Sequence, residues 1–263
     1  MIIDFHAHFF PDSIAKATVE KMSAHAGVIH YGDGHLASLL DFMKQDSISL
    51  SVNLPVATTH TQVQNINKRM IETNNKYAGQ VICFGAMHPD FPNPKEELHF
   101  ISENGIKGIK LHPEYQSFYP DDERMLAIYE ACIKYNLFIA FHSGADVAYN
   151  TVHGNSERFK QVRKISGLRF SLAHTGAYRQ WDDVERYLLG EDIYFDISCS
   201  NEMNNDQMKY ILENHRADRI LFGTDFPWER ASVMIKKVET LGLDEELKNK
   251  LYYKNAQELL KLI

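Results

Sequence analysis

Short apolar runs alternate with longer amphipathic stretches along the whole chain. The runs are nearly continuous in apolar side chains, which is typical of parallel strands buried on both faces. The stretches between them carry apolar residues at helical spacing, as Leu36, Leu39 and Met43 do. The runs predict eight strands, at residues 1–8, 47–55, 81–87, 105–111, 137–141, 170–173, 193–197 and 220–223. The stretches predict helices at residues 13–25, 36–43, 60–77, 94–102, 121–135, 156–165, 182–189, 206–214, 229–241 and 245–262.

The order of these elements predicts an α/β fold of the (β/α)₈ TIM-barrel type. Eight strands, each followed by a helix, within about 250 residues is the count expected of that barrel. A doubly wound open sheet is the alternative, but it needs a glycine-rich turn after the first strand. The segment HAHFFPD at 6–12 contains no glycine. Because no linker or break in composition divides the chain, we expect residues 1–263 to form a single domain.

Composition narrows the choice of partners and compartment. The chain has 28 basic and 35 acidic residues, a net charge of −7, and no basic run, which argues against nucleic acid or an anionic membrane surface as partner. No apolar run approaches the ~20 residues of a membrane span. Cys83, Cys132 and Cys199 are widely spaced and form no CxxC, as in a reduced cytoplasm. Acidic Asp4 follows Met1 closely, so we expect no signal peptide and a cytoplasmic protein.

Polar residues with metal-binding or catalytic chemistry gather at the carboxyl ends of the predicted strands. Active sites of barrels lie at that rim. Side chains alternate along a strand, so His6 and His8 project from the same face, roughly 6.5–7 Å apart along it, and can grip one ion. Six of the thirteen histidines lie at these strand ends. The residues at the rim are His6, His8, His88, Lys110, His112, His142, His174 and Asp225.

Several segments resemble those of the amidohydrolase superfamily of metal-dependent barrels, in particular its aminocarboxymuconate-semialdehyde decarboxylase-like members. They are IDFHAH at 3–8, FHSG at 141–144, AHTG at 173–176, DRILFGTDFPW at 218–228 and NAQELLKL at 255–262. The resemblance implies that His6, His8, His142 and Asp225 bind a metal ion, most often zinc. It also implies that His174 faces the substrate or a second metal.

The fourth strand leaves the number of metal ions open. IKLHPE at 109–114 resembles the segment in which dihydroorotase-like relatives carry a carboxylated lysine between two metals. That resemblance would make Lys110 a bridge, with His142 and His174 on the second ion. The alternative is that Lys110 pairs with a buried carboxylate such as Asp4 or Asp196. Dihydroorotase activity itself is disfavoured, because those enzymes carry arginine where this chain has Phe10.

Two reactions fit this set of residues. Metal-dependent hydrolysis of a small amide, lactone, cyclic imide or ester would use Asp225 as proton acceptor for the attacking water and the metal or His174 to polarise the carbonyl. Non-oxidative decarboxylation of an aromatic or unsaturated acid is the alternative on the same site. A carboxylate-binding arginine would favour decarboxylation, and Arg158, Arg163 and Arg179 follow strands five and six. A third hypothesis is a barrel that binds metal without catalysing a reaction. A full set of metal ligands together with an acid–base group argues against it.

The remaining candidates concern the substrate pocket and the assembly. His88 and His112 each precede a proline at a strand end and are candidates for substrate contact. The expected partner is a small-molecule substrate, and related barrels often form homodimers. The candidate aromatic residues for an apolar pocket wall are Phe9, Phe10, Tyr115 and Trp228.

Overall fold

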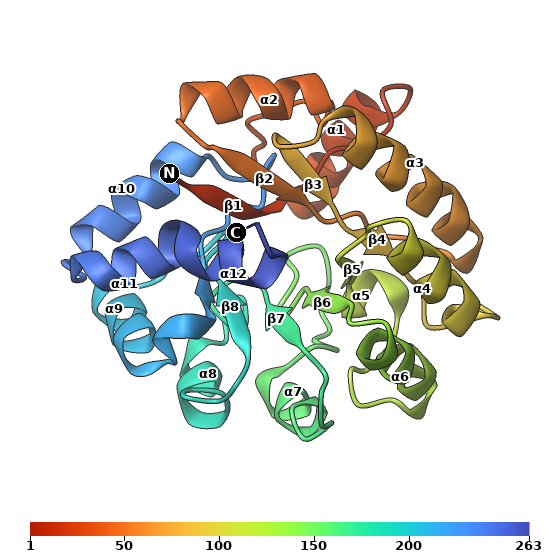
Figure 1. Cartoon of the computed structure of the whole chain (residues 1–263). Helices are drawn as coiled ribbons and strands as arrows, with labels where there is room; N and C mark the ends of the chain where they lie inside the picture. Colours follow the sequence, from red (N-terminus) through yellow and green to blue (C-terminus); the bar gives the residue numbers. More distant parts are fainter. Residues whose placement is uncertain (263) are drawn as a thin grey trace.

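A computed structural model describes residues 1–262, in which short parallel strands are surrounded by helices (Figure 1). The strands form two parallel sheets, one of order β1-β2-β3 and one running in order from β4 to β9. The third predicted strand is divided, because Phe84 separates β3 from β4. The bounds are β1 (Ile3–Ala7), β2 (Leu50–Asn53), β3 (Val81–Cys83), β4 (Gly85–Ala86), β5 (Gly108–Leu111), β6 (Phe138–Phe141), β7 (Phe170–Leu172), β8 (Tyr194–Asp196) and β9 (Ile220–Leu221).

Backbone hydrogen bonds connect the two sheets at both of their edges. The amide of Phe84 donates to the carbonyl of Asn53 on β2 at 2.9 Å. At the other edge the amide of Phe5 on β1 donates to the carbonyl of Phe222, just after β9, at 2.8 Å. The first and last strands therefore lie side by side, and the predicted (β/α)₈ barrel is confirmed.

The predicted helices are present; most are shorter than expected, but those at 36–45, 94–103 and 205–214 are one or two residues longer. Two of them begin with a turn of 3₁₀ helix, η1 (His60–Gln62) before α3 and η2 (Glu123–Met125) before α6, and a further 3₁₀ turn, η3 (Ala217–Arg219), precedes β9. The last predicted helix is interrupted by a π-helical segment, η4 (Lys250–Lys254). The bounds are α1 (Ala15–Ala26), α2 (Leu36–Gln45), α3 (Val63–Lys76), α4 (Pro94–Glu103), α5 (Pro113–Gln116), α6 (Leu126–Lys134), α7 (Ser156–Val162), α8 (Trp181–Tyr187), α9 (Asn205–Asn214), α10 (Ala231–Thr240), α11 (Glu245–Asn249) and α12 (Asn255–Leu260). Among residues 1–262, no helix is long and apolar enough to cross a bilayer.

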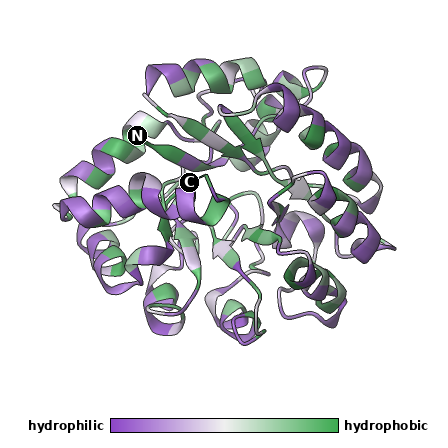
Figure 2. Cartoon of the chain, in the orientation of Figure 1, coloured by the Kyte–Doolittle hydropathy of each residue, from purple (hydrophilic) through white to green (hydrophobic). Residues whose placement is uncertain are grey.

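The apolar core has an inner part within the strands and an outer part under the helices. Figure 2 shows apolar colouring on the strands and polar colouring on the outer faces of the helices. Within the barrel, the ring of Phe5 packs edge-on against those of Phe84 and Phe138, with centroids 5.7 and 5.9 Å apart. Ala140 and Leu221 belong to the same inner cluster. This packing fills the barrel interior and leaves the polar residues at its rim.

An irregularity in β1 brings His6 to that rim. The register between β1 and β2 shifts between Asp4 and Ala7. The amide of His6 donates to Asp4 Oδ1 at 3.1 Å instead of to the neighbouring strand. Asp4 also accepts hydrogen bonds from the amide and hydroxyl of Thr224, at 2.9 and 2.7 Å. A bulge of this kind re-aims side chains, so Phe5 fills the interior while His6 reaches the site.

Candidate metal and catalytic site

Three donor atoms meet where β1 lies beside the segment after β9. His6 Nε2 lies 3.2 Å from His8 Nε2 and 3.2 Å from Asp225 Oδ1, and His8 Nε2 lies 2.8 Å from the same oxygen. Ligands about 2.0–2.2 Å from one ion lie roughly 3.0–3.4 Å from each other, for angles between 90° and tetrahedral. The three donors therefore have nearly the spacing that one divalent ion requires.

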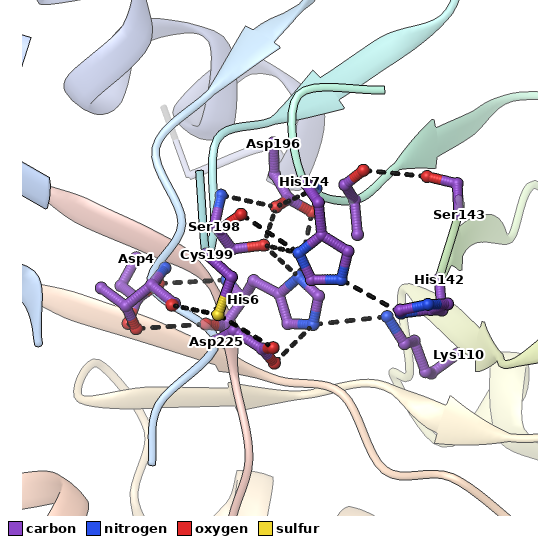
Figure 3. Close-up of polar contacts among 12 residues, drawn as sticks. Asp4, His6, Lys110, His142, Ser143, His174, Asp196, Ser198, Cys199 and Asp225 are labelled. Atoms are coloured by element: carbon purple, nitrogen blue, oxygen red, sulfur yellow. Dashed lines mark hydrogen bonds and ion pairs between the residues drawn. The ribbon is translucent and has the colours of Figure 1, made fainter. Parts of the chain in front are cut away.

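Hydrogen bonds fix the orientation of the His6 ring. Its Nδ1 lies 3.1 Å from Asp196 Oδ2 and 3.0 Å from the hydroxyl of Ser198. A carboxylate only accepts, so Nδ1 carries the proton. The Nε2 lone pair then faces Asp225 (Figure 3), and His8 lies on the same side. Burial, with a smaller contribution from Lys110, lowers the pKa of His6 to about 4. This carboxylate–histidine arrangement is the one that commonly supports a metal ligand.

His174 and His142 form a pair beside this group, with His174 Nε2 3.0 Å from His142 Nδ1. At one end, His174 Nδ1 lies 3.1 Å from the carbonyl of Ser198; at the other, His142 Nε2 lies 3.2 Å from the carbonyl of Ala145. Carbonyls only accept, so both outer nitrogens donate, and one further proton lies between the rings. The hydrogen bonds are therefore all made when the pair holds three protons, one more than two neutral rings carry.

The predicted ligand His142 lies outside the group of three. The atoms of His6, His8 and Asp225 lie within 4.8 Å of one another, whereas His142 falls in another group with His112 and Asp146. Its ring faces His174 and Ala145. Its role as a fourth ligand stays a prediction.

Lys110 lies next to the three donors. Its Nζ is 3.3 Å from His6 Nε2, and the residue is only 1% exposed. Burial lowers its pKa to about 8. Among residues 1–262, no carboxylate lies within 4 Å of this amine, so the alternative pairing with Asp4 or Asp196 is not found. Lys110 thus faces the candidate metal site, and a part of the lysine population is neutral near pH 8.

The second group, His112, His142 and Asp146, is better explained as a stacked wall than as a metal site. His112 Nδ1 accepts from the amide of Tyr115 at 3.4 Å, so its Nε2 carries the proton and faces Asp146 Oδ2 at 3.4 Å. The His112 ring lies parallel to those of Tyr115 and His142, with centroids 3.9 and 4.0 Å away. Parallel rings at this separation cannot direct their lone pairs at one ion.

The candidate residues open into one large cavity of about 1550 Å³. This exceeds the roughly 300–1,000 Å³ typical of small-molecule sites. Seven of the eight rim residues and all four predicted aromatic residues line it: His6, His8, Lys110, His112, His142, His174 and Asp225, with Phe9, Phe10, Tyr115 and Trp228. His88 does not line the cavity; it is 6% exposed and its Nδ1 accepts from the amide of Asp90 at 3.1 Å. The structure therefore does not bring His88 to the site.

The arginine that could bind a substrate carboxylate is not one of the three expected. Arg158 and Arg163 lie outside the cavity lining, and Arg179 lines the cavity but pairs with Glu202 at 2.6 Å. Arg69 on α3 also lines the cavity. Within residues 1–262 it has no ion pair or side-chain hydrogen bond. The sequence predicts that Arg69 lies in the helix at 60–77. Helical periodicity alone does not show that the side of the helix that carries Arg69 faces the site.

Two further residues of the site follow β8 and were missed by the sequence. Ser198 donates to Asp196 Oδ1 and lies 3.1 Å from His174 Nδ1, so it connects the surroundings of His6 and His174. Cys199 Sγ lies 3.4 Å from Asp225 Oδ2, whereas Cys83 and Cys132 are buried as expected. The polar run after the seventh predicted strand was the available signal, because every strand end faces the same rim.

Backbone strain accompanies the site. His174 and Asp225 have φ angles of 62° and 67°, in the left-handed region that side chains other than glycine seldom adopt. Such conformations are retained where the surroundings enforce them, often at functional sites. Burial opposes the charge on Asp225, yet His6, His8 and His174 hold its pKa well below the usual value.

The buried histidines predict that the metal-free protein loses stability in mild acid. Burial lowers the pKa of His6 and His215 to about 4, and that of His112 and His142 well below 6.5. Between pH 6.5 and about 4 the unfolded chain binds protons that the folded one does not, so the free energy of unfolding should fall as pH falls. Asp4 and Glu229 act in the opposite direction, since burial raises the pKa of Asp4 from 3.8 to about 7 and also raises that of Glu229. The histidines outnumber them, because burial lowers the pKa of His88 as well.

Urea unfolding of the metal-free chain across that window tests this expectation. A variant of an exposed histidine, His99→Gln, should follow the wild-type pH profile. Stability that stays constant or rises toward pH 4 would contradict the expectation.

Comparison with known proteins relates this geometry to a family. The family described as amidohydrolase matches residues 3–262. A search of curated proteins finds no match. An uncharacterized TIM-barrel protein from Bordetella bronchiseptica aligns with a TM-score of 0.77 at 16% identity, covering 99% of this chain and 98% of that one.

Two decarboxylases are similar in structure. The 5-carboxyvanillate decarboxylase of Novosphingobium aromaticivorans, complexed with manganese and 4-hydroxy-3-methoxy-5-nitrobenzoic acid, has a TM-score of 0.73, 16% identity and coverage of 99% and 96%. The 2,6-dihydroxybenzoate decarboxylase of Rhizobium has a TM-score of 0.72, 15% identity and coverage of 99% and 98%. At these identities the likeness establishes the fold.

Proposed function

Because the chain belongs to the amidohydrolase family, we propose that it is a metal-dependent enzyme that releases CO₂ from an aromatic or unsaturated acid. Hydrolysis was the first expectation from the sequence and decarboxylation the alternative. The structural neighbours of known activity that are described above are decarboxylases, which supports the alternative. The family and the barrel are established, and the reaction is the proposal.

One observation carries the choice of reaction, namely the hydrogen-bonded pair formed by His174 and His142 beside the three donors. Hydrolysis needs a base to deprotonate water, which Asp225 alone can supply. Decarboxylation needs a proton for the carbon atom that loses CO₂. The hydrogen bonds of the pair are all made only when it holds an extra proton, and His174 lines the cavity.

His6, His8 and Asp225 would hold the metal ion. His142, the fourth ligand that the resemblance implies, would have to give up its contact with His174 Nε2 to offer Nδ1 to the ion. When bound, a divalent ion would orient the substrate acid and stabilise negative charge that develops on it. Two imidazoles and one carboxylate suit zinc, which the sequence resemblance implies, and also manganese, which accompanies the Novosphingobium enzyme. We propose one such ion per chain for the decarboxylase.

The residues of the chain would then act in a simple order. The bond between the substrate carbon and its carboxylate breaks, and its electron pair stays on the carbon as CO₂ leaves. His174 gives the proton at Nε2 to that carbon. Asp225, whose pKa is well below its usual value, stays ionised and can accept a proton from a substrate hydroxyl. The stacked rings of Tyr115 and His112 form a flat wall that suits an aromatic substrate.

Lys110 favours a second candidate, hydrolysis at a bridged pair of ions. The lysine lies 3.3 Å from His6, and its pKa is lowered to about 8, so much of it is neutral near pH 8. Only a neutral amine reacts with CO₂ to form the bridging carbamate. Two ions per chain and a carbamate signal on incubation with ¹³C-bicarbonate would support this candidate.

The two functions separate in one set of assays. The full chain, loaded with manganese or with zinc, is incubated with hydroxybenzoates and unsaturated acids to measure CO₂ release, and with lactones and amides to measure hydrolysis. We expect CO₂ release without hydrolysis and one ion per chain. Hydrolysis without CO₂ release would overturn the proposal, and a chain that binds metal but releases neither product would overturn both candidates.

A further inference from the structure

The cavity extends beyond the catalytic residues into what we call the outer lobe, between α1 and α3. Its lining comes from α1 and adjoining residues, and from α3 with the segment before it. Figure 1 places both helices at the same side of the barrel. The residues of the outer lobe that matter below are Ile14, Lys21, Met22, His25, Ile29, Ile66, Arg69 and Met70.

The outer lobe carries basic side chains without acidic ones. Lys21, His25 and Arg69 line it, whereas no aspartate or glutamate from the same segments does. In the part of the chain that the structure describes, none of the three has an ion pair or a side-chain hydrogen bond. Several arginines elsewhere on the molecule pair with acidic neighbours, as Arg230 does with Asp46 and Arg219 with Asp192. The chain as a whole has a net charge of −7, whereas Lys21 and Arg69 make the outer lobe locally positive.

The same lobe exposes large apolar side chains. Ile14 is 49% and Ile29 71% exposed, and Met22, Ile66 and Met70 contribute to the same lining. Exposed apolar side chains that gather at a cavity are typical of binding surfaces. Basic groups beside an apolar surface match a ligand that has an apolar stretch and an anionic end.

We propose that the outer lobe binds the far end of the substrate, an apolar extension that terminates in a carboxylate or phosphate. The inference rests on the proposed decarboxylation, because the reacting carboxylate is taken to lie at His6, His8 and Asp225. Arg69 is the central residue, since a half-buried guanidinium can bind an anionic group through two parallel hydrogen bonds. The substrate is thus an acid with a second anionic group, which also accounts for a cavity of about 1550 Å³.

Binding measurements test the lobe separately from catalysis. The probes are benzoate and two benzoates extended at the para position, one by a butanoate and one by a butylphosphonate. Each is titrated calorimetrically into the full metal-loaded chain. We expect at least one extended probe to bind about tenfold or more tightly than benzoate, the gain expected from a charge-assisted hydrogen bond.

Variants assign that gain to the lobe. Arg69→Gln should remove most of the preference for the extended probe and change benzoate binding by less than about twofold. Lys68→Gln is the matched control, because Lys68 is the exposed neighbour on α3 and does not line the cavity. Lys21→Gln is a second test on the opposite wall, with a smaller loss expected.

Equal binding of all three probes, or equal weakening by the Arg69 and Lys68 variants, would overturn the inference. Failure of the proposed function gives a different result. In that case CO₂ release is absent for every acid while the preference for extended probes and its loss in Arg69→Gln persist.

Discussion

Replacing His6 with alanine should remove the metal ion and lower the activity by at least about a thousandfold. Its Nε2 is one of three donors 2.8–3.2 Å apart, and two donors hold a divalent ion far less tightly. The loss of several kcal/mol of charge stabilisation corresponds to that factor in rate. Metal content by mass spectrometry after dialysis and CO₂ release measure the two effects.

Two further variants test whether the loss of metal in His6→Ala comes from the loss of a ligand. His88→Ala should keep both metal and activity, because His88 lies outside the cavity lining. Asp196→Asn keeps a side chain beside His6 Nδ1 but no longer requires that nitrogen to donate, so metal affinity should fall about 10–100-fold. Retention of a full complement of metal by His6→Ala would show that the ion binds elsewhere.

Replacing His174 with glutamine should lower kcat by about 10²–10⁴-fold while the metal ion stays bound. Glutamine can still donate near the Ser198 carbonyl, but it cannot supply the proton that we propose the His174–His142 pair gives to the substrate. Single-turnover CO₂ release gives the chemical step, and metal content on the same sample shows that the ion is retained.

The neighbouring ring of Tyr178 provides the control for His174. Its centroid lies 5.6 Å from that of His174, so Tyr178→Phe preserves the packing and should leave kcat within a few-fold. Loss of metal together with activity in His174→Gln would instead make His174 a ligand. It would then favour the two-ion arrangement with Lys110.

The sequence was sufficient for the barrel and for the gathering of its polar residues. Buried parallel strands read as apolar runs, and their carboxyl ends share one rim, so order along the chain predicted that His6, His8 and Asp225 meet. The division of the third strand at Phe84 was not predictable, because VICFGAM is one continuous apolar run. The register shift in β1 was also missed, since it accompanies the binding of Asp4 to Thr224, which lies just after the neighbouring strand β9.

The finer features of the site depend on neighbours that are distant in sequence. The carbonyl of Ser198 requires Nδ1 of His174 to carry a proton. No sequence pattern near His174 predicts that contact. Arg69 lies on α3, within a predicted helix, but which side of that helix faces the cavity depends on how the helix packs on the strands. The sequence directed attention to Arg158, Arg163 and Arg179 because they follow strand ends, whereas Arg69, which lines the cavity, comes from a helix of the outer layer.

The hydrogen bonds between β1 and the segment after β9 link the site to the folding of the chain. Asp4 and Thr224 are 220 positions apart, and closing so long a loop carries a large entropic cost before any contact offsets it. His6 and His8 stand on one side of this junction and Asp225 on the other. The proposed ion site would therefore exist only in molecules whose barrel has closed, and the ion would bind the native state in preference to every open intermediate. Metal uptake during refolding would thus report the last step of assembly, and free metal concentration would shift the folding equilibrium by mass action.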